Sequence, residues 1–124
     1  MLQFRNLDAY RYAVALLEMT FTICHDVLHP PHLLAERLQG AALAVLRALA
    51  EAHHRQAANR PEACHCYGLA RGSAFECVGL LDTLERLRAV TVPDATRARE
   101  VLTRVIAMLC HLEGEAARPP PQAP

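Results

Sequence analysis

Two copies of a glutamate followed three positions later by a histidine are the residues of this sequence that could do metal chemistry. They read Glu51-Ala52-His53-His54 and Glu62-Ala63-Cys64-His65. Residues three apart share one face of a helix, and bundles that bind two iron ions use this spacing. If the chain folds back near residue 58, each glutamate faces a histidine of the other segment. Either these groups form two glutamate–histidine hydrogen bonds that fasten a hairpin, or four of them bind a metal: Glu51, His54, Glu62 and His65.

The sequence favours the hydrogen-bonded pairs over the metal site. Di-iron sites lie midway along a bundle and need two more inward-facing glutamates. The only candidates are Glu18 and Glu100, and their neighbours in the sequence place both on polar helix faces. Cys64 and Cys66 do not predict a zinc site, because alternate residues of a helix point about 200° apart. Ser73, the only serine, lacks the strand-to-helix turn of a nucleophile. We therefore expect no catalytic residue, no metal and no cofactor.

Arginine is the residue type through which this chain would bind nucleic acid. All 13 basic residues are arginine, and 13 acidic residues balance them. Arginine binds phosphate through two parallel hydrogen bonds, and residues 37–71 hold five arginines against two glutamates. A neutral domain lacks the usual basic footprint, so an ordinary solvated face is the simpler interpretation. The candidates for phosphate contact are Arg47, Arg55, Arg60, Arg71, His53 and His54.

Four amphipathic helices must position these residues. Prolines at 30–31, 61 and 93 divide the chain, and no segment alternates like a strand. Helices are predicted up to residue 28, over 32–56, from 59–62 onward and from 93 onward. Short connections predict an all-α, antiparallel up-down-up-down four-helix bundle over residues 1–118. Residues 119–124 are predicted to form a disordered proline-rich tail.

The first predicted helix carries two apolar stripes, although a helix that packs on one layer needs only one. The extra surface predicts contact with another subunit. Gly72 and Ser73 are expected to allow a tight helix crossing, and Glu76 to pair with Arg47, Arg55 or Arg71. The stripe expected to be buried is Leu7, Tyr10, Val14, Leu17, Phe21, Cys24 and Leu28; the stripe beside it is Ala9, Ala13, Leu16, Ile23 and Val27.

The later helices each carry one stripe at helical spacing. These stripes are expected to form the core of the bundle. Their members are Leu34, Leu38, Ala41, Val45, Ala48 and Ala52; Tyr67, Ala70, Ala74, Cys77, Leu81 and Leu84; and Ala98, Leu102, Val105, Leu109 and Leu112.

Length and composition limit the class of protein. The chain has 124 residues, and 52% of them are hydrophobic, which predicts one folded domain. No apolar run approaches about 18 residues, so no membrane span is expected, and no signal peptide is recognisable. Five cysteines without an export signal predict reduced thiols, mostly in the core, in a cytoplasmic protein.

Three segments resemble the four-helix-bundle family named after the 23S rRNA intervening-sequence protein. They are Phe4-Arg5-Asn6-Leu7-Asp8-Ala9-Tyr10, Ala50-Glu51 and Ala70-Arg71-Gly72-Ser73-Ala74-Phe75-Glu76. The usual Asn-Ile-Ala-Glu-Gly of the family reads Ala48-Leu49-Ala50-Glu51-Ala52 here. The resemblance covers about residues 4–112 and implies a homopentamer of four-helix bundles without enzyme activity. The family includes the accessory variability determinant of diversity-generating retroelements, which binds RNA or DNA and assists a reverse transcriptase.

The function predicted from the sequence is a non-enzymatic, oligomeric scaffold that could serve as a nucleic-acid-binding accessory protein of the reverse-transcriptase type. Reversing Arg55 and Arg60 to glutamate is expected to abolish RNA binding without changing the size of the oligomer. Two alternatives stay open: a small metal-binding bundle, and a scaffold whose partner is another protein recruited by the proline-rich tail.

Overall fold

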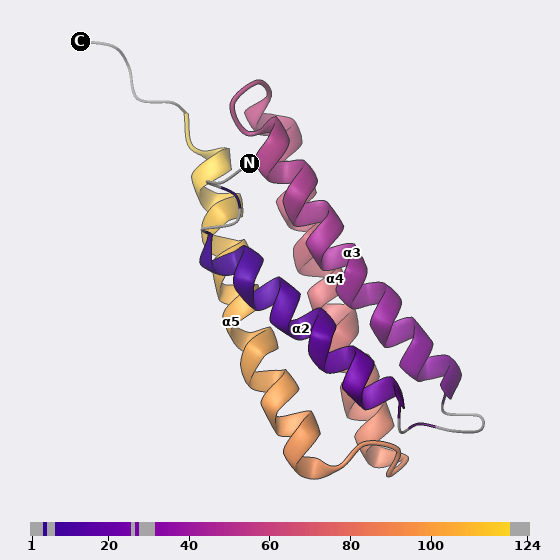
Figure 1. Cartoon of the computed structure of the whole chain (residues 1–124). Coiled ribbons are helices and arrows are strands. Elements are labelled where there is room, and N and C mark those ends of the chain that lie inside the picture. The colour runs from indigo at the N-terminus through magenta and orange to yellow at the C-terminus, as the bar shows by residue number, and fades with distance from the viewer. Residues whose placement is uncertain (1–3, 5–6, 26, 28–31, 120–124) are drawn as a thin grey trace.

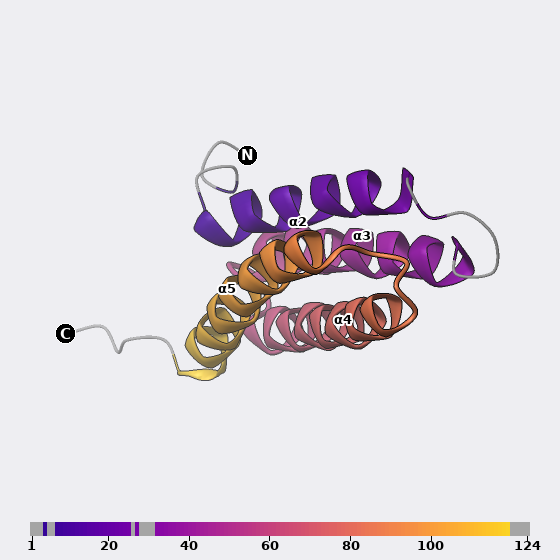
Figure 2. The same ribbon diagram turned by 90° about the horizontal axis from the view of Figure 1, so that it is seen from below.

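Four helices form the protein in a computed structural model that describes residues 4, 7–25, 27 and 32–119. They are α2 (Asp8–His25), α3 (His32–Arg55), α4 (Arg60–Arg86) and α5 (Val92–Ala117), lying side by side (Figure 1). No strand occurs in the described ranges. Helices α2 and α4 each pack on both α3 and α5, so they occupy opposite sides of the bundle (Figure 2). The predicted all-α class with four packed helices is confirmed.

The helix starts follow from capping residues visible in the sequence. The side chain of Asn59 accepts a hydrogen bond from the backbone N–H of Glu62 at 3.1 Å, and Pro61 occupies the first turn of α4. Thr91 caps α5 in the same way by accepting from the N–H of Asp94. Each cap satisfies an N–H that the helix itself leaves without a partner. The predicted starts of these two helices are therefore confirmed.

Helix α4 ends in a hydrogen-bonded reversal that contains no glycine. The N–H of Ala89 donates to the carbonyl of Leu84, and the N–H of Arg88 donates to the carbonyl of Glu85, each at 2.9 Å. This pattern requires a left-handed residue at the second position after the helix, and Arg88 has φ 58°. The reversal carries the chain directly into α5.

The predicted core stripe of α4 is confirmed throughout, while α3 and α5 bury most but not all of theirs. Leu34, Ala48 and Leu112 are half-buried instead of fully buried. Leu49, which is not a member of the predicted α3 stripe, also belongs to the core. Tyr67 on α4 is the largest fully buried side chain.

The prediction for the first helix has the two stripes the wrong way round. The structure buries Ala9, Ala13, Leu16 and Ile23, together with Thr20, whose hydroxyl donates to the Leu17 carbonyl at 2.6 Å. Alanine lets α2 approach α3 and α5 closely, so the small-residue stripe faces inward. The stripe with the larger side chains therefore stays at the surface: Tyr10, Leu17 and Cys24 are half-buried, and Val14 and Phe21 are exposed. Leu28 lies outside the described residues, as do residues 120–124 of the predicted tail.

Gly72 was predicted to lie at a tight helix crossing, but no other helix of the chain packs closely against it. A methyl group added at Gly72 would meet nothing within 4 Å, and the same holds for Gly79. At Gly68 such a group would come within 3.0 Å of the Glu113 carboxylate. Gly68 is therefore where the absence of a side chain leaves room for the Glu113 carboxylate of α5.

Candidate functional site

Arg55 holds both glutamates of the motifs that suggested metal binding. Its Nε donates to Glu51 Oε1 at 2.6 Å, and its Nη1 donates to Glu62 Oε2 at 2.9 Å. Glu51 and Arg55 lie one turn apart on α3, and Glu62 lies in the first turn of α4. The predicted glutamate–histidine pairs are thus replaced by one arginine that bridges the hairpin. The guanidinium already faces two carboxylates, which compete with any phosphate.

The bridge changes the electrostatics of Glu51. The hydrogen bond and charge of Arg55 hold the pKa of the Glu51 carboxyl below its usual range, and His54 adds a smaller effect in the same direction. A carboxylate stabilised in this way stays ionised at neutral pH and binds Arg55 until the solution becomes acidic. Because both groups are exposed, the pair contributes little to stability.

Arg60 fastens the far end of α5 instead of facing solvent with a free guanidinium. Its Nη2 donates to the carbonyl oxygens of Glu115 at 2.5 Å and of Arg118 at 2.9 Å. These carbonyls lie at the C-terminus of α5, where the helix leaves acceptors without partners and where a cation is favoured. Arg60 therefore acts as a cap for a helix 55 positions further along the chain.

Arg71 forms a two-pronged ion pair with Glu113 of α5. The Nε–Oε1 distance is 2.8 Å and the Nη2–Oε2 distance is 3.3 Å. The carboxylate lies against Gly68, where a side chain would take its place. Glu113 is partly shielded from water, so this pair is the best sequestered of those formed by the candidate arginines.

Glu76 pairs with Arg37, which was not among its three expected partners. Arg37 Nε donates to Glu76 Oε1 at 2.6 Å, linking α3 to α4. None of the three expected partners, Arg47, Arg55 or Arg71, forms this contact. Both groups are partly exposed, so the pair fits a surface link between helices and not a buried charge.

Arg47 is the one candidate arginine without a hydrogen-bond or ion-pair partner in the part of the chain that the structure describes. It lines an open groove of about 420 Å³ between α3 and α4, together with Glu51, Cys66 and Ser73. His53 lies half-buried further along α3, with its ring 5.2 Å from that of Phe4, and His54 is exposed.

The six predicted phosphate-contact residues do not converge on one surface. Arg47 and Arg55 lie along the α3–α4 junction, whereas Arg60 and Arg71 bind groups of α5. Three of the four arginines are already bound within the chain. The structure therefore divides the predicted site between two sides of α4.

Metal-binding groups are not gathered either. Among the described residues, no three side chains of histidine, cysteine, aspartate or glutamate lie close enough together to hold an ion. Cys64 directs its sulfur toward the Glu113 carbonyl of α5 at 3.6 Å, while Cys66 lines the groove beside α3. The two thiols thus face different helices, as the helical spacing predicts.

The cysteines are free but mostly not part of the core. Cys77 is buried, Cys24, Cys64 and Cys66 are half-buried, and Cys110 is exposed. Burial, with a smaller effect of Glu36, raises the pKa of the Cys24 thiol to about 11, and this thiol donates to the Ala35 carbonyl. The expectation that most of the five lie in the core is met only by Cys77.

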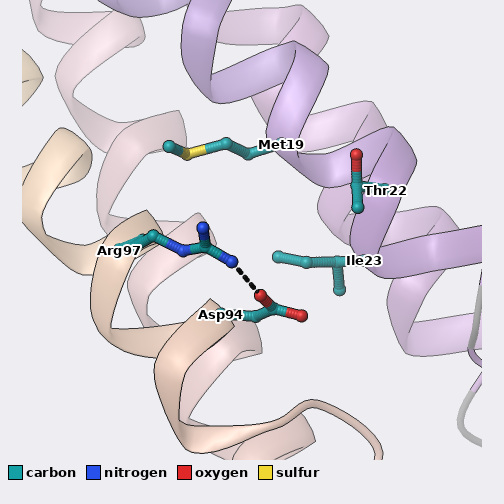
Figure 3. A pocket seen from close by; sticks show the side chains of 5 residues that line it. All are labelled: Met19, Thr22, Ile23, Asp94 and Arg97. Atoms are coloured by element: carbon teal, nitrogen blue, oxygen red, sulfur yellow. Dashed lines mark hydrogen bonds and ion pairs between the residues drawn. The ribbon is translucent and has the colours of Figure 1, made fainter.

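A small pocket between α2 and α5 is too small to be a cofactor site (Figure 3). Its volume is about 150 Å³, and Met19, Thr22 and Ile23 from α2 face an ion pair between Arg97 and Asp94 of α5. Sites for drug-sized ligands measure roughly 300–1,000 Å³. The pocket holds a methionine and a salt-bridged aspartate but no nucleophile next to a base.

Several contacts that join the helices escaped the sequence analysis. Arg99 of α5 binds both Asp82 and Glu85 of α4, and Arg104 donates to the Tyr12 hydroxyl at 2.7 Å while lying over its ring. The partners are at least 14 positions apart, so no local spacing indicates them. The planar guanidinium bonds to two groups at once, which suits a chain whose cations are all arginine.

These features define an all-α protein of four packed helices, in which arginine–carboxylate bridges link α3 to α4 and α4 to α5. A scan against models of known protein families finds no match for this chain, and a search of curated proteins finds none either. None of the described helices has an apolar stretch long enough to cross a membrane.

Proposed function

We propose that this chain is a non-enzymatic scaffold, an antiparallel four-helix bundle that assembles with copies of itself into a closed ring. The observation that carries the proposal is the outer stripe of α2, defined as Tyr10, Val14, Leu17 and Phe21. These residues recur at intervals of four and three, the pattern by which helices interlock. Phe21 is 60% exposed and Val14 is 38% exposed. Such a row in a small domain is typical of a protein interface.

The opposite side of the bundle offers a complementary surface on α4. Gly72 and Gly79 have open space around them, and Leu69 and Phe75 on the same helix are each 53% exposed. Glycines between larger apolar residues form hollows into which the side chains of another helix can insert. Because α2 and α4 lie on opposite sides, contact between them joins copies head to tail, and a suitable rotation closes a ring. The resemblance found in the sequence implies five copies.

The scaffold proposal predicts that Phe21→Glu reduces the assembly to monomers. A charge placed within an apolar contact must be desolvated without a partner, which costs several kcal/mol. Sedimentation velocity of the full chain at fixed concentration measures the change. Leu43→Glu is the matched control, since Leu43 is 47% exposed but lies on α3, on neither of the two surfaces. Far-UV circular dichroism checks that each variant stays helical.

A second substitution, Phe75→Glu, distinguishes a ring from a two-fold dimer. In a ring both Phe21→Glu and Phe75→Glu break the assembly, because each contact uses both surfaces. A two-fold dimer through α2 would be broken by the first substitution alone. A wild-type chain that sediments as a monomer at micromolar concentration would contradict the scaffold proposal.

Nucleic-acid binding gains little support from the geometry, because only Arg47 among the four candidate arginines has no partner in the described residues. We expect labelled structured RNA to bind weakly, with a log–log salt slope no steeper than about −2, corresponding to one or two neutralised phosphates. Fluorescence anisotropy over a salt series measures this slope. Arg47→Glu should remove the residual binding, and Arg86→Glu, on another exposed arginine, should not. A salt slope of about −4 or steeper in the wild-type chain, together with loss of that binding in Arg47→Glu, would instead indicate a belt of arginines around the ring.

Reversal of Arg55 and Arg60 is a poor test of RNA binding in this structure. Arg55 bridges the α3–α4 hairpin and Arg60 caps α5. Their reversal would place like charges against Glu51 and Glu62 and remove the cap. Loss of RNA binding in that variant would not separate recognition from folding.

A further inference from the structure

The groove between α3 and α4 contains a cation that the contacts within the chain leave unused. Its volume is about 420 Å³, and much of its lining is small or apolar: Ala44, Ala48 and Leu69. Arg47 also lines it, is exposed, and has no hydrogen-bond or ion-pair partner in the described part of the chain. Glu51, the acidic residue of the lining, is bound by Arg55. The groove therefore suits an apolar surface that carries a carboxylate for Arg47.

The outer stripe of α2 is an apolar surface with one such carboxylate. Glu18 lies one turn after Val14 and one turn before Phe21, and it is the only acidic residue between positions 9 and 25. Residues three and four positions apart are neighbours on a helix, so this carboxylate lies beside the stripe. Glu18 is exposed and, like Arg47, has no partner among the residues that the structure describes. Each surface thus carries one unpaired charge, and the two charges are opposite.

The order of charges along the two helices is complementary as well. On α2, Arg11 lies two turns before Glu18. On α3, Glu51 lies one turn after Arg47. If α2 of one copy runs antiparallel to α3 of the next, the register that brings Glu18 to Arg47 also brings the second pair of opposite charges together. The two spacings differ by three residues, or about 4.5 Å, which an arginine side chain can span. A parallel crossing would supply only one of the two contacts.

We propose that the outer stripe of α2 in one copy binds in the α3–α4 groove of the next copy, with Glu18 bound to Arg47 of that neighbour. This inference rests on the scaffold proposal and names the groove and the ion pair that join the copies. Leu69 lines the groove and also belongs to the receiving surface of α4, so the two are continuous. A carboxylate–guanidinium pair forms two parallel hydrogen bonds, which fix the register of the contact.

A nucleic acid is a poorer occupant of this groove. A phosphate could bind Arg47, but it would leave the apolar lining and the outer stripe of α2 uncovered. Glu18 of a neighbouring copy covers both surfaces and competes with phosphate for the same guanidinium. This competition agrees with the weak RNA binding expected above.

Charge reversal on each side, alone and together, tests the pair in the full chain. Glu18→Arg and Arg47→Glu should each raise the Kd of assembly about tenfold or more, because like charges then meet. The double variant Glu18→Arg/Arg47→Glu should return to within about threefold of the wild-type value, since the pair is restored with its signs exchanged. Sedimentation velocity over a dilution series measures these values. Added salt should weaken assembly of the wild-type chain and the double variant but strengthen that of the single variants, because salt screens attraction and repulsion alike.

The matched controls reverse exposed charges that the proposed contact does not use: Glu100→Arg on α5 and Arg88→Glu in the reversal after α4. Each should leave the Kd within about twofold of the wild-type value. Far-UV circular dichroism checks that every variant stays helical.

The outcomes separate this inference from the scaffold proposal. If the wild-type chain assembles but the reversals at positions 18 and 47 behave like the controls, the ion pair is overturned and the scaffold proposal stands. A double variant no better than the single variants would also overturn the pair. Disruption by Glu18→Arg but not by Arg47→Glu would indicate a two-fold contact through α2 and overturn the groove as its receiver. A wild-type chain that stays monomeric would overturn both proposals.

Discussion

Replacing Tyr67 by alanine should lower the free energy of unfolding by about 3–5 kcal/mol. Tyr67 is completely buried and is the largest side chain of the core. Its removal leaves a cavity among helices that can only partly close over it. A small domain has roughly 5–15 kcal/mol of stability in total, so this single change brings the chain close to unfolding at room temperature. Urea denaturation followed by far-UV circular dichroism measures the loss, at one protein concentration because assembly also stabilises the fold.

Tyr67→Phe separates the packing of the ring from the hydrogen bond of its hydroxyl. That hydroxyl donates to Gln56 Oε1 at 2.9 Å and ties α4 to the end of α3. Phenylalanine keeps the ring, so its cost should be about 1 kcal/mol, the net value of one hydrogen bond. A loss in Tyr67→Ala no larger than that in Tyr67→Phe would contradict the central place of this side chain in the core.

Cys77 should react with iodoacetamide roughly a thousand times more slowly in the folded chain than in the unfolded chain at pH 8. Burial raises the pKa of its thiol to about 12, and the adjacent Glu76 carboxylate adds to the shift. The thiolate is the reactive species. A free thiol with pKa near 8.5 is about a quarter ionised at pH 8, whereas one with pKa near 12 is ionised to about one part in ten thousand.

Mass spectrometry of the labelled peptides measures these rates, and Cys110 is the internal control because it is exposed on α5. In urea above the unfolding midpoint, Cys77 should regain an ordinary rate. Rapid labelling of Cys77 in the folded chain would contradict its burial. The raised pKa also makes the free energy of unfolding depend on pH, because the folded state favours the protonated thiol. This stabilising contribution is complete below about pH 8.5 and is lost as the pH rises toward about 12.

Local signals in the sequence were enough to predict the helices and most of their inward faces. Proline and capping residues are local signals, because the N–H groups of a first turn find their acceptor within three residues. This is why Asn59 and Pro93 could mark the starts of α4 and α5. One clear stripe per helix was also sufficient for α4, since it had no competing apolar face.

Packing between the helices settled two things that local signals left open: which of the two α2 stripes is buried, and which carboxylate each arginine meets. Both stripes satisfy helical periodicity, and the choice depends on how closely α3 and α5 approach, which favoured Ala9 and Ala13 over Tyr10 and Phe21. The bridges from Arg37 to Glu76 and from Arg71 to Glu113 span about forty positions, so no local spacing predicts them. The sequence shows that an arginine is charged but not which group it will bind. In the folded chain, three of the four candidate arginines bind groups of the chain itself.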